Sequence, residues 1–199
     1  MVRAIFLGTF DPPHNGHLEL LRSISEHASN YNIEKIHVIP SIQNPNKKKS
    51  TNFTDRYRMC MRAFASLSHN VVIDDIEDSF EHKYTYELID YIKEHDKVIG
   101  NDFIWIITVE TYKEILEGHW KESEKLLNEC NFLIIYNSKE KSFVDSLKNK
   151  SNIILFEYIF TEEVHSTDIR TILKSNCTEC PCSLDNNVFD YIKENHLYI

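Results

Sequence analysis

The chain has 199 residues, of which 42% are hydrophobic and 27% charged, and its formal net charge is −9. This length and balance favour one soluble α/β domain, and the acidic charge argues against binding to a nucleic-acid duplex, which usually needs a basic face. An odd number of cysteines, five, argues against a secreted disulfide framework. No apolar run is long enough for a signal peptide or a membrane helix. We therefore expect a cytoplasmic protein with one domain over residues 1–199 and with no nucleic-acid or membrane partner.

Apolar runs alternate along the chain with stretches of helical periodicity. In chain order we expect a strand at 3–7, a helix at 16–31, a strand at 35–40, a helix at 55–66, a strand at 71–73, a helix at 85–94, a strand at 103–109, helices at 111–116 and 122–128, a strand at 132–136, a helix at 143–148, a strand at 153–156, and helices at 167–174 and 188–195. The alternation predicts an α/β fold: a doubly wound, Rossmann-like parallel sheet with helices on both faces and a small C-terminal helical part. Such sheets bind ligands at the carboxyl ends of their strands.

The residues after the first predicted strand, Gly8 to His17, read G-x-F-x-P-x-H-x-G-H. They match neither the dinucleotide fingerprint nor the Walker A loop. Gly8 would let a ligand approach the backbone, and Gly16 leaves space where the next helix begins. A helix N-terminus offers N–H groups and a positive dipole end to phosphate, and His14 and His17 lie one turn apart. The segment therefore predicts a phosphate-binding loop.

A second constellation lies late in the chain, at Ser166, Thr167 and Arg170. Either hydroxyl is suited to cap the helix that follows, and Arg170 falls on the same face as Thr167. A hydroxyl, helix N–H groups and a guanidinium at one place suit a polyphosphate. Taken alone, the pattern is also that of a plain capped helix with an exposed arginine.

Together the two patterns resemble the nucleotidylyltransferase superfamily with the H-x-G-H signature. Within it the chain is similar to the bacterial-type nicotinate mononucleotide adenylyltransferases. Further similar stretches are Ile39-Pro40 followed by Asn44-Pro45-Asn46-Lys47, Arg56 to Met59 with Ala63, Tyr84-Thr85, and Tyr191-Ile192 to Leu197-Tyr198. The resemblance spans almost the whole chain.

The chain departs from the family pattern in its middle. Thr108-Val109-Glu110 stands where the family usually has G-A-D, and Asn46 stands where it has histidine. The segment Tyr136-Asn137-Ser138 lacks the basic residue that is common there. These changes bear on the contacts to ATP and on the preference for nicotinate.

The resemblance implies transfer of AMP from ATP to nicotinate mononucleotide, which gives nicotinate adenine dinucleotide and pyrophosphate in NAD biosynthesis. Mg²⁺ would accompany ATP, with no dedicated metal site, and a homo-oligomer is left open. The implied catalytic residues are His14, His17 and Arg170. The implied ATP-binding residues are Gly8, Thr9, Phe10, Gly16, Lys47, Glu110, Ser166 and Thr167. The implied acceptor-binding residues are Thr85, Tyr112 and Trp120, although Trp120 is equally well read as a core aromatic.

Two alternatives stay open. Another H-x-G-H enzyme, such as pantetheine-phosphate adenylyltransferase or a cytidylyltransferase, would share the same loop. A nucleotide-binding regulator without activity would share the fold. Cys177, Cys180 and Cys182 have spacing that could suit zinc with His196, but a reduced surface loop is the favoured reading.

Overall fold

The computed structural model describes residues 2–42, 51–67, 69–76, 84–95, 97, 99, 102–159, 164–175 and 179–198. Six strands form one parallel sheet in the order β3-β2-β1-β4-β5-β6. The strands are β1 (Val2–Gly8), β2 (Ile33–Pro40), β3 (Val71–Ile73), β4 (Phe103–Thr108), β5 (Asn131–Tyr136) and β6 (Ile153–Glu157). The helices are α1 (Asn15–Glu26), α2 (Phe53–Ala63), α3 (Thr85–His95), α4 (Val109–Leu116), α5 (Ser123–Glu129), α6 (Lys141–Asp145), α7 (Ser166–Lys174) and α8 (Asn186–Glu194), with short 3₁₀ turns η1 (Ala28–Tyr31) and η3 (Ser138–Glu140). The predicted Rossmann-like class is confirmed.

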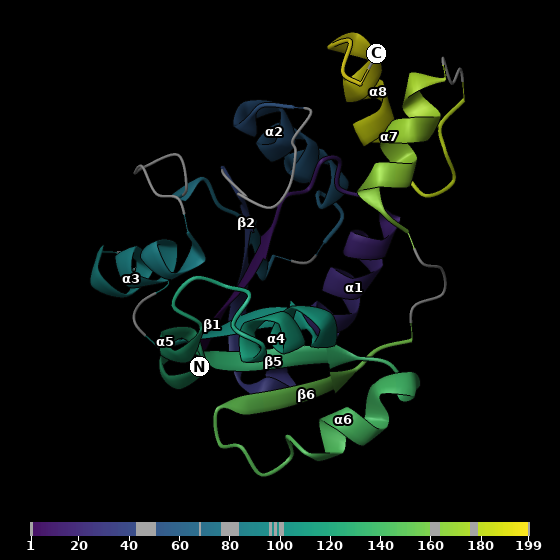
Figure 1. Ribbon diagram of the computed structural model, residues 1–199. Helices are drawn as coiled ribbons and strands as arrows, with labels where there is room; N and C mark the ends of the chain where they lie inside the picture. Colours follow the sequence, from purple (N-terminus) through teal and green to yellow (C-terminus); the bar gives the residue numbers. More distant parts are fainter. Residues whose placement is uncertain are drawn as a thin grey trace.

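Strand β1 occupies the centre of the sheet, between β2 and β4. Its last residue, Gly8, pairs with Pro40 on one side, and Phe6 pairs with Ile106 on the other. The chain first winds outward through β2 and β3 and then returns to build β4, β5 and β6 on the opposite side of β1 (Figure 1). The order therefore reverses between β1 and β4, which is where doubly wound sheets bind ligands.

The sheet is covered on both faces, because its strands alternate their side chains between two apolar clusters. Ala4 and Phe6 of β1 join one cluster, and Ile5 between them joins the other. Helices α1, α2, α7 and α8 supply the first cluster, and α3, α4, α5 and α6 supply the second. The continuous apolar run of β4, Phe103 to Ile107, is buried throughout for the same reason.

Some predicted boundaries were wrong. The helix predicted at 16–31 ends at Glu26 and is followed by η1. Asn32 takes a left-handed conformation (φ 59°) that ends η1 and turns the chain into β2. The strand predicted at 103–109 ends at Thr108, and Val109 is buried as the first residue of α4. The helix predicted at 143–148 occupies Lys141–Asp145 instead.

Helices α7 and α8 lie beside each other at one end of the molecule, and α8 contacts α2 (Figure 1). This C-terminal part also reaches the start of α1: the backbone N–H of Asn15 donates to the Ser183 carbonyl at 2.9 Å, and its side chain donates to the Cys182 carbonyl at 2.8 Å. In the described part of the chain, no helix combines the length and the apolar character that a membrane crossing needs.

Candidate active site

The loop after β1 is built around the buried ring of Phe10. This ring packs edge-to-face on Phe6, Phe64 and His17, with centroid distances of 5.0–6.0 Å. A Cβ on Gly8 would lie only 2.7 Å from the Phe10 Cζ. We predicted from the sequence that the space beside Gly8 admits a ligand, but the Phe10 ring fills it. Because this ring is buried, Phe10 can contact a ligand only through its backbone.

His14 and His17 meet at the N-terminus of α1, as their spacing predicted. His14 is the N-cap residue, and its backbone N–H donates to His17 Nδ1 at 3.3 Å. The two rings stack with centroids 3.7 Å apart. Because His17 Nδ1 accepts this bond, neutral His17 carries its proton on Nε2, which makes Nε2 a donor for an anion.

His14 is buried, with 8% of its surface exposed. Burial and then the charge of His165 lower the pKa of His14 to about 4, so the ring is neutral at pH 7. Its Nδ1 finds no hydrogen-bond partner among the described residues. A Cβ on Gly16 would lie 3.1 Å from this Nδ1, so the absence of a side chain at Gly16 is what gives the ring its room.

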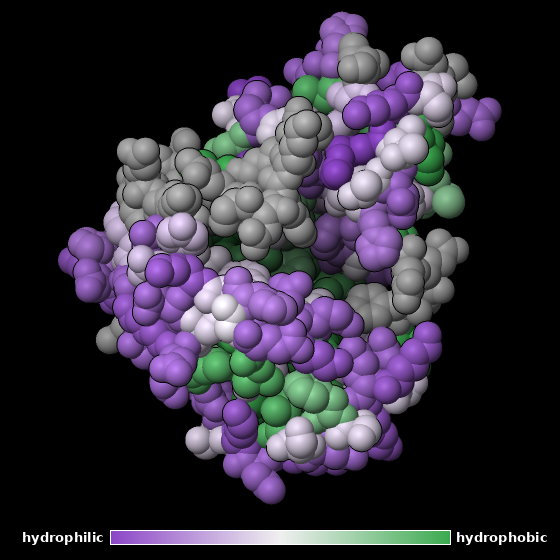
Figure 2. All heavy atoms as spheres, in the orientation of Figure 1, coloured by the Kyte–Doolittle hydropathy of each residue, from purple (hydrophilic) through white to green (hydrophobic). Residues whose placement is uncertain are grey.

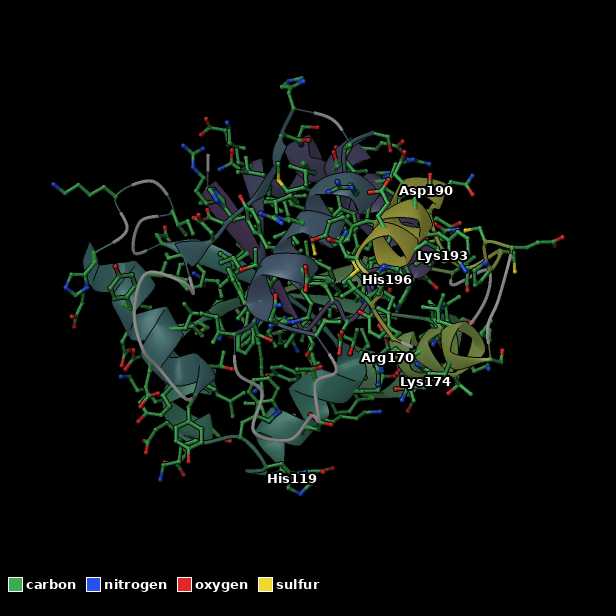
Figure 3. The ribbon with its side chains drawn as sticks, turned by 90° about the horizontal axis from the view of Figure 1, so that it is seen from above. His119, Arg170, Lys174, Asp190, Lys193 and His196 are labelled. Atoms are coloured by element: carbon green, nitrogen blue, oxygen red, sulfur yellow. The ribbon has the colours of Figure 1, made fainter. Side chains whose placement is uncertain are left out.

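The late constellation joins the same loop, as the sequence predicted. Arg170 Nη1 donates to the Asp11 carbonyl at 2.7 Å, and Nη2 donates to Thr167 Oγ1 at 3.1 Å. Figure 3 shows Arg170 on the side of α7 toward the middle of the molecule, with Lys174 one turn further along. Ser166 Oγ donates to the Pro12 carbonyl at 2.9 Å. Ser166 is thus the first residue of α7 rather than its cap, and it docks the helix onto the loop.

Four residues that hold this loop in place had no role assigned from the sequence: Asp11, Thr51, Arg56 and Tyr198. Arg56 of α2 is fully buried, and its Nη1 donates to the Thr9 carbonyl at 2.7 Å. The carboxylate of Asp11 is buried and accepts hydrogen bonds from Thr51 and Tyr198. Arg56 and Tyr198 were part of the family resemblance without an assigned function, and Asp11 occupies an unspecified position of the motif. A charged residue within a glycine- and proline-rich loop was the available signal.

Glu110 lies in the first turn of α4, directly after β4, where the nucleotide-binding crevice is expected. Burial raises the pKa of Glu110, but hydrogen bonds, first among them one with Glu140, outweigh it and bring the pKa below its ordinary value. Burial and the neighbouring Glu110 raise the pKa of Glu140. Of the two carboxyl groups, Glu110 is therefore the one that ionises at the lower pH. The surface is hollowed between α4 and α7, with hydrophobic side chains on the floor (Figure 2).

The three predicted acceptor-binding residues lie in different settings. Thr85 is the first residue of α3, and Tyr84 occupies the cap position, with its backbone N–H donating to Glu87 Oε2 at 2.9 Å. Tyr112 is 1% exposed and packs edge-to-face on Phe132, so its ring has no face open to a ligand. The Trp120 Nε1 donates to Glu114 at 3.0 Å, and its ring packs on Trp105 and stays half-buried. Lys47 and the loop around it lie outside the described residues.

The cysteine segment does not assemble a metal centre in the part of the chain that the structure describes, where no group of three His, Cys, Asp or Glu side chains could hold an ion. The Cys180 thiol donates to the Leu184 carbonyl at 3.3 Å, and Cys182 is exposed. Cys177 falls outside the described residues, so zinc binding by the full C-x-x-C-x-C pattern stays untested.

Comparisons with known proteins identify the family of the chain and similar solved structures. A family model described as cytidylyltransferase-like matches residues 5–172. A probable nicotinate-nucleotide adenylyltransferase of Clostridium botulinum strain Okra is 30% identical over 98% of both chains. One from Leptospira interrogans is 30% identical over 100% of this chain and 97% of its own length. The structure of Plasmodium falciparum nicotinic acid mononucleotide adenylyltransferase complexed with NaAD superposes with a TM-score of 0.77, at 25% identity, over 98% of this chain and 96% of the other.

Proposed function

Because the chain belongs to the cytidylyltransferase-like family, we propose that it transfers AMP from ATP to nicotinate mononucleotide, giving nicotinate adenine dinucleotide and pyrophosphate in NAD biosynthesis. One observation carries the proposal: the stacked imidazoles of His14 and His17 cap α1 at the point where the strand order reverses. The names of the relatives support nicotinate mononucleotide as the acceptor. A cytoplasmic location and a homo-oligomer remain predictions.

The proposed reaction needs no protein nucleophile. An ionised oxygen of the mononucleotide phosphate attacks the α-phosphorus of ATP, the bond from that phosphorus to the bridging oxygen breaks, and pyrophosphate leaves with the electron pair. Charge builds on the phosphate oxygens during this displacement. The site can therefore work by positioning the two phosphates in line and by donating hydrogen bonds to the developing charge.

We assign the catalytic donors to His14, His17 and Arg170. The Nε2–H of His17 and the N-terminus of α1 would face the phosphates, and the neutral His14 would add a second imidazole. Arg170 uses two of its N–H groups on the loop and on Thr167, and the rest of its fork is suited to the leaving pyrophosphate. The backbone around Gly8, Thr9, Phe10 and Gly16 and the start of α7 at Ser166 and Thr167 would complete the ATP site, with Lys47 adding charge.

Glu110 keeps a negative charge after β4 and would accept from the ribose hydroxyls of ATP. Thr85 and Trp120 are the acceptor residues that keep this role, because they are half-buried whereas Tyr112 is a core residue. Mg²⁺ would enter as part of the MgATP substrate, bound by the phosphates rather than by a cage of carboxylates.

The test is pyrophosphate release from MgATP with nicotinate mononucleotide, nicotinamide mononucleotide and phosphopantetheine in parallel, with ATP binding measured on the same preparation. We expect strong release with the nicotinate form. Release with phosphopantetheine alone would retain the chemistry and replace the acceptor. A folded protein that binds ATP and releases pyrophosphate with none of the three would instead be a nucleotide-binding regulator.

A further inference from the structure

We propose that Tyr198 is a positioning residue for adenylyl transfer, acting through Asp11 on the loop that carries His14. The proposal rests on the proposed function, because the loop is the one that would hold the ATP phosphates. Tyr198 itself would touch no substrate. Its effect on turnover would come from fixing where the first imidazole stands.

Asp11 is the residue at which three separate segments hold the loop. Its Oδ1 accepts from the Thr51 hydroxyl at 2.6 Å and from the Tyr198 hydroxyl at 2.7 Å. Its backbone carbonyl accepts from Arg170 at 2.7 Å. Asp11 is 3% exposed, so its carboxylate depends on such donors in place of water.

The hydroxyl of Tyr198 is fixed as a donor. Tyr198 is 6% exposed, and burial followed by the charge of Asp11 raises its pKa far above the ordinary value, so the phenol keeps its proton at any working pH. Its backbone has a φ of 64°, in the left-handed region that an aromatic residue adopts only where its surroundings hold it. The protonated phenol therefore acts as a donor of fixed position to the Asp11 carboxylate.

The contact between Tyr198 and Asp11 lies close in sequence to His14, so it can affect the position of the His14 imidazole. Asp11 precedes His14 by three residues. The carbonyl of Pro12, which lies between them, accepts from Ser166, and the carbonyl of Thr9, two residues before Asp11, accepts from Arg56. His14 itself is wedged against Gly16 and stacked on His17. A small displacement of the loop would therefore move the imidazole relative to the α-phosphorus, and displacements of about 1 Å are known to reduce turnover about 100-fold.

The chain contains a matched control at Tyr191 of α8. Its hydroxyl also donates to a carboxylate oxygen, Asp55 Oδ1, at the same 2.7 Å, and Tyr191 is 3% exposed. Asp55 lies in α2 and not in the loop. Tyr198→Phe and Tyr191→Phe thus each remove a phenol-to-carboxylate bond from the C-terminal part. The first bond is buried and ends on the loop, and the second is partly buried and ends on α2.

Both variants are measured for melting temperature, kcat and KM. We expect each to melt about 5 °C lower, the size expected for one charge-assisted hydrogen bond in a chain of this length. Tyr198→Phe should lower kcat about 10-fold with KM for both substrates within about twofold, and Tyr191→Phe should keep its kcat. Equal kcat in the two variants, whether lowered or unchanged, would overturn the proposal.

A second comparison tests the route through Asp11. In Asp11→Ala the acceptor of the Tyr198 hydroxyl is gone, so adding Tyr198→Phe to it should lower kcat no further. Multiplying losses in the double variant would mean that Tyr198 acts by another route. The imidazole NMR signals of His14 provide a readout without turnover: they should shift in Tyr198→Phe and stay in Tyr191→Phe. This readout separates a failure of the proposal from a failure of the assigned reaction.

Discussion

The stacking of the His14 and His17 rings and the burial of His14 disfavour a positive charge on these imidazoles in the free protein. Two protonated imidazoles with centroids 3.7 Å apart would repel each other, and burial already disfavours a charge on His14. A polyphosphate placed at the α1 N-terminus would supply the negative charge that makes protonation favourable. At the scale of single residues, the buried ring of His14 is therefore uncharged before ATP binds.

The lowered pKa of His14 predicts that the free energy of unfolding decreases as the pH falls below 7. The pKa of His14 is about 4 in the folded chain and near 6.5 when unfolded. Between these values the unfolded chain binds a proton that the folded chain does not bind, so lowering the pH favours unfolding. From pH 7 to pH 5 the wild type should lose roughly 2 kcal/mol more stability than His14→Asn. Urea unfolding at both pH values measures this, and parallel losses in the two proteins would contradict it.

The sequence predicted the residues that a local pattern can mark and missed those that it cannot. His14, His17 and Arg170 lie near one another as expected, because a sequence motif marks the histidines and a helix start marks the arginine. Their catalytic roles remain predictions. Asp11 and Tyr198 are 187 positions apart in the chain. No periodicity, cap or spacing connects a carboxylate in a loop with a phenol that far away, so the contact needed the folded structure.

At the scale of elements, the apolar runs were the most informative sequence signal for the positions of the strands. The apolar runs at 3–7 and 103–109 correctly predicted the buried strands β1 and β4 in a parallel sheet with helices on both faces. Helix ends were less predictable, because the apolar spacing from Leu18 to Ala28 continues past Glu26, where α1 ends and the chain goes on into the 3₁₀ turn η1. Val109 was misplaced since a buried valine is compatible with the end of a strand and with the buried face of a helix.

The junction of β1 with its loop yields a test at this scale. Gly8→Ala would place a methyl group 2.7 Å from the Phe10 ring, which Phe6, Phe64 and His17 confine. We expect a destabilisation of about 2 kcal/mol from overpacking, with a fall in turnover as the ring presses on His17.

The control is Gly118→Ala, where the added methyl group meets no atom within 4 Å and only the left-handed backbone (φ 75°) is strained. This strain should cost about 1 kcal/mol and leave turnover unchanged. Chemical denaturation and the pyrophosphate assay measure both variants. A Gly8→Ala protein as stable and as active as the control would show that the Phe10 ring has room to move.

At the scale of the whole molecule, the two apolar clusters share one sheet, so they should unfold together as a single domain. Trp105 and Trp120 report on the sheet face that is covered by α3, α4, α5 and α6. The buried Cys60 thiol reports on the opposite face, which is covered by α1, α2, α7 and α8. Tryptophan fluorescence and Cys60 labelling, resolved by peptide mass spectrometry, should give the same urea midpoint. Separate midpoints would divide the chain into two units.

The span between Asp11 and Tyr198 also orders events in time. On the ribosome, the loop that carries His14 emerges long before Tyr198 has been made. The phenol that holds the loop comes 187 residues after the carboxylate that it binds. Contacts of such sequence separation form late in folding. A nascent chain would thus acquire its architecture first and its catalytic geometry afterwards.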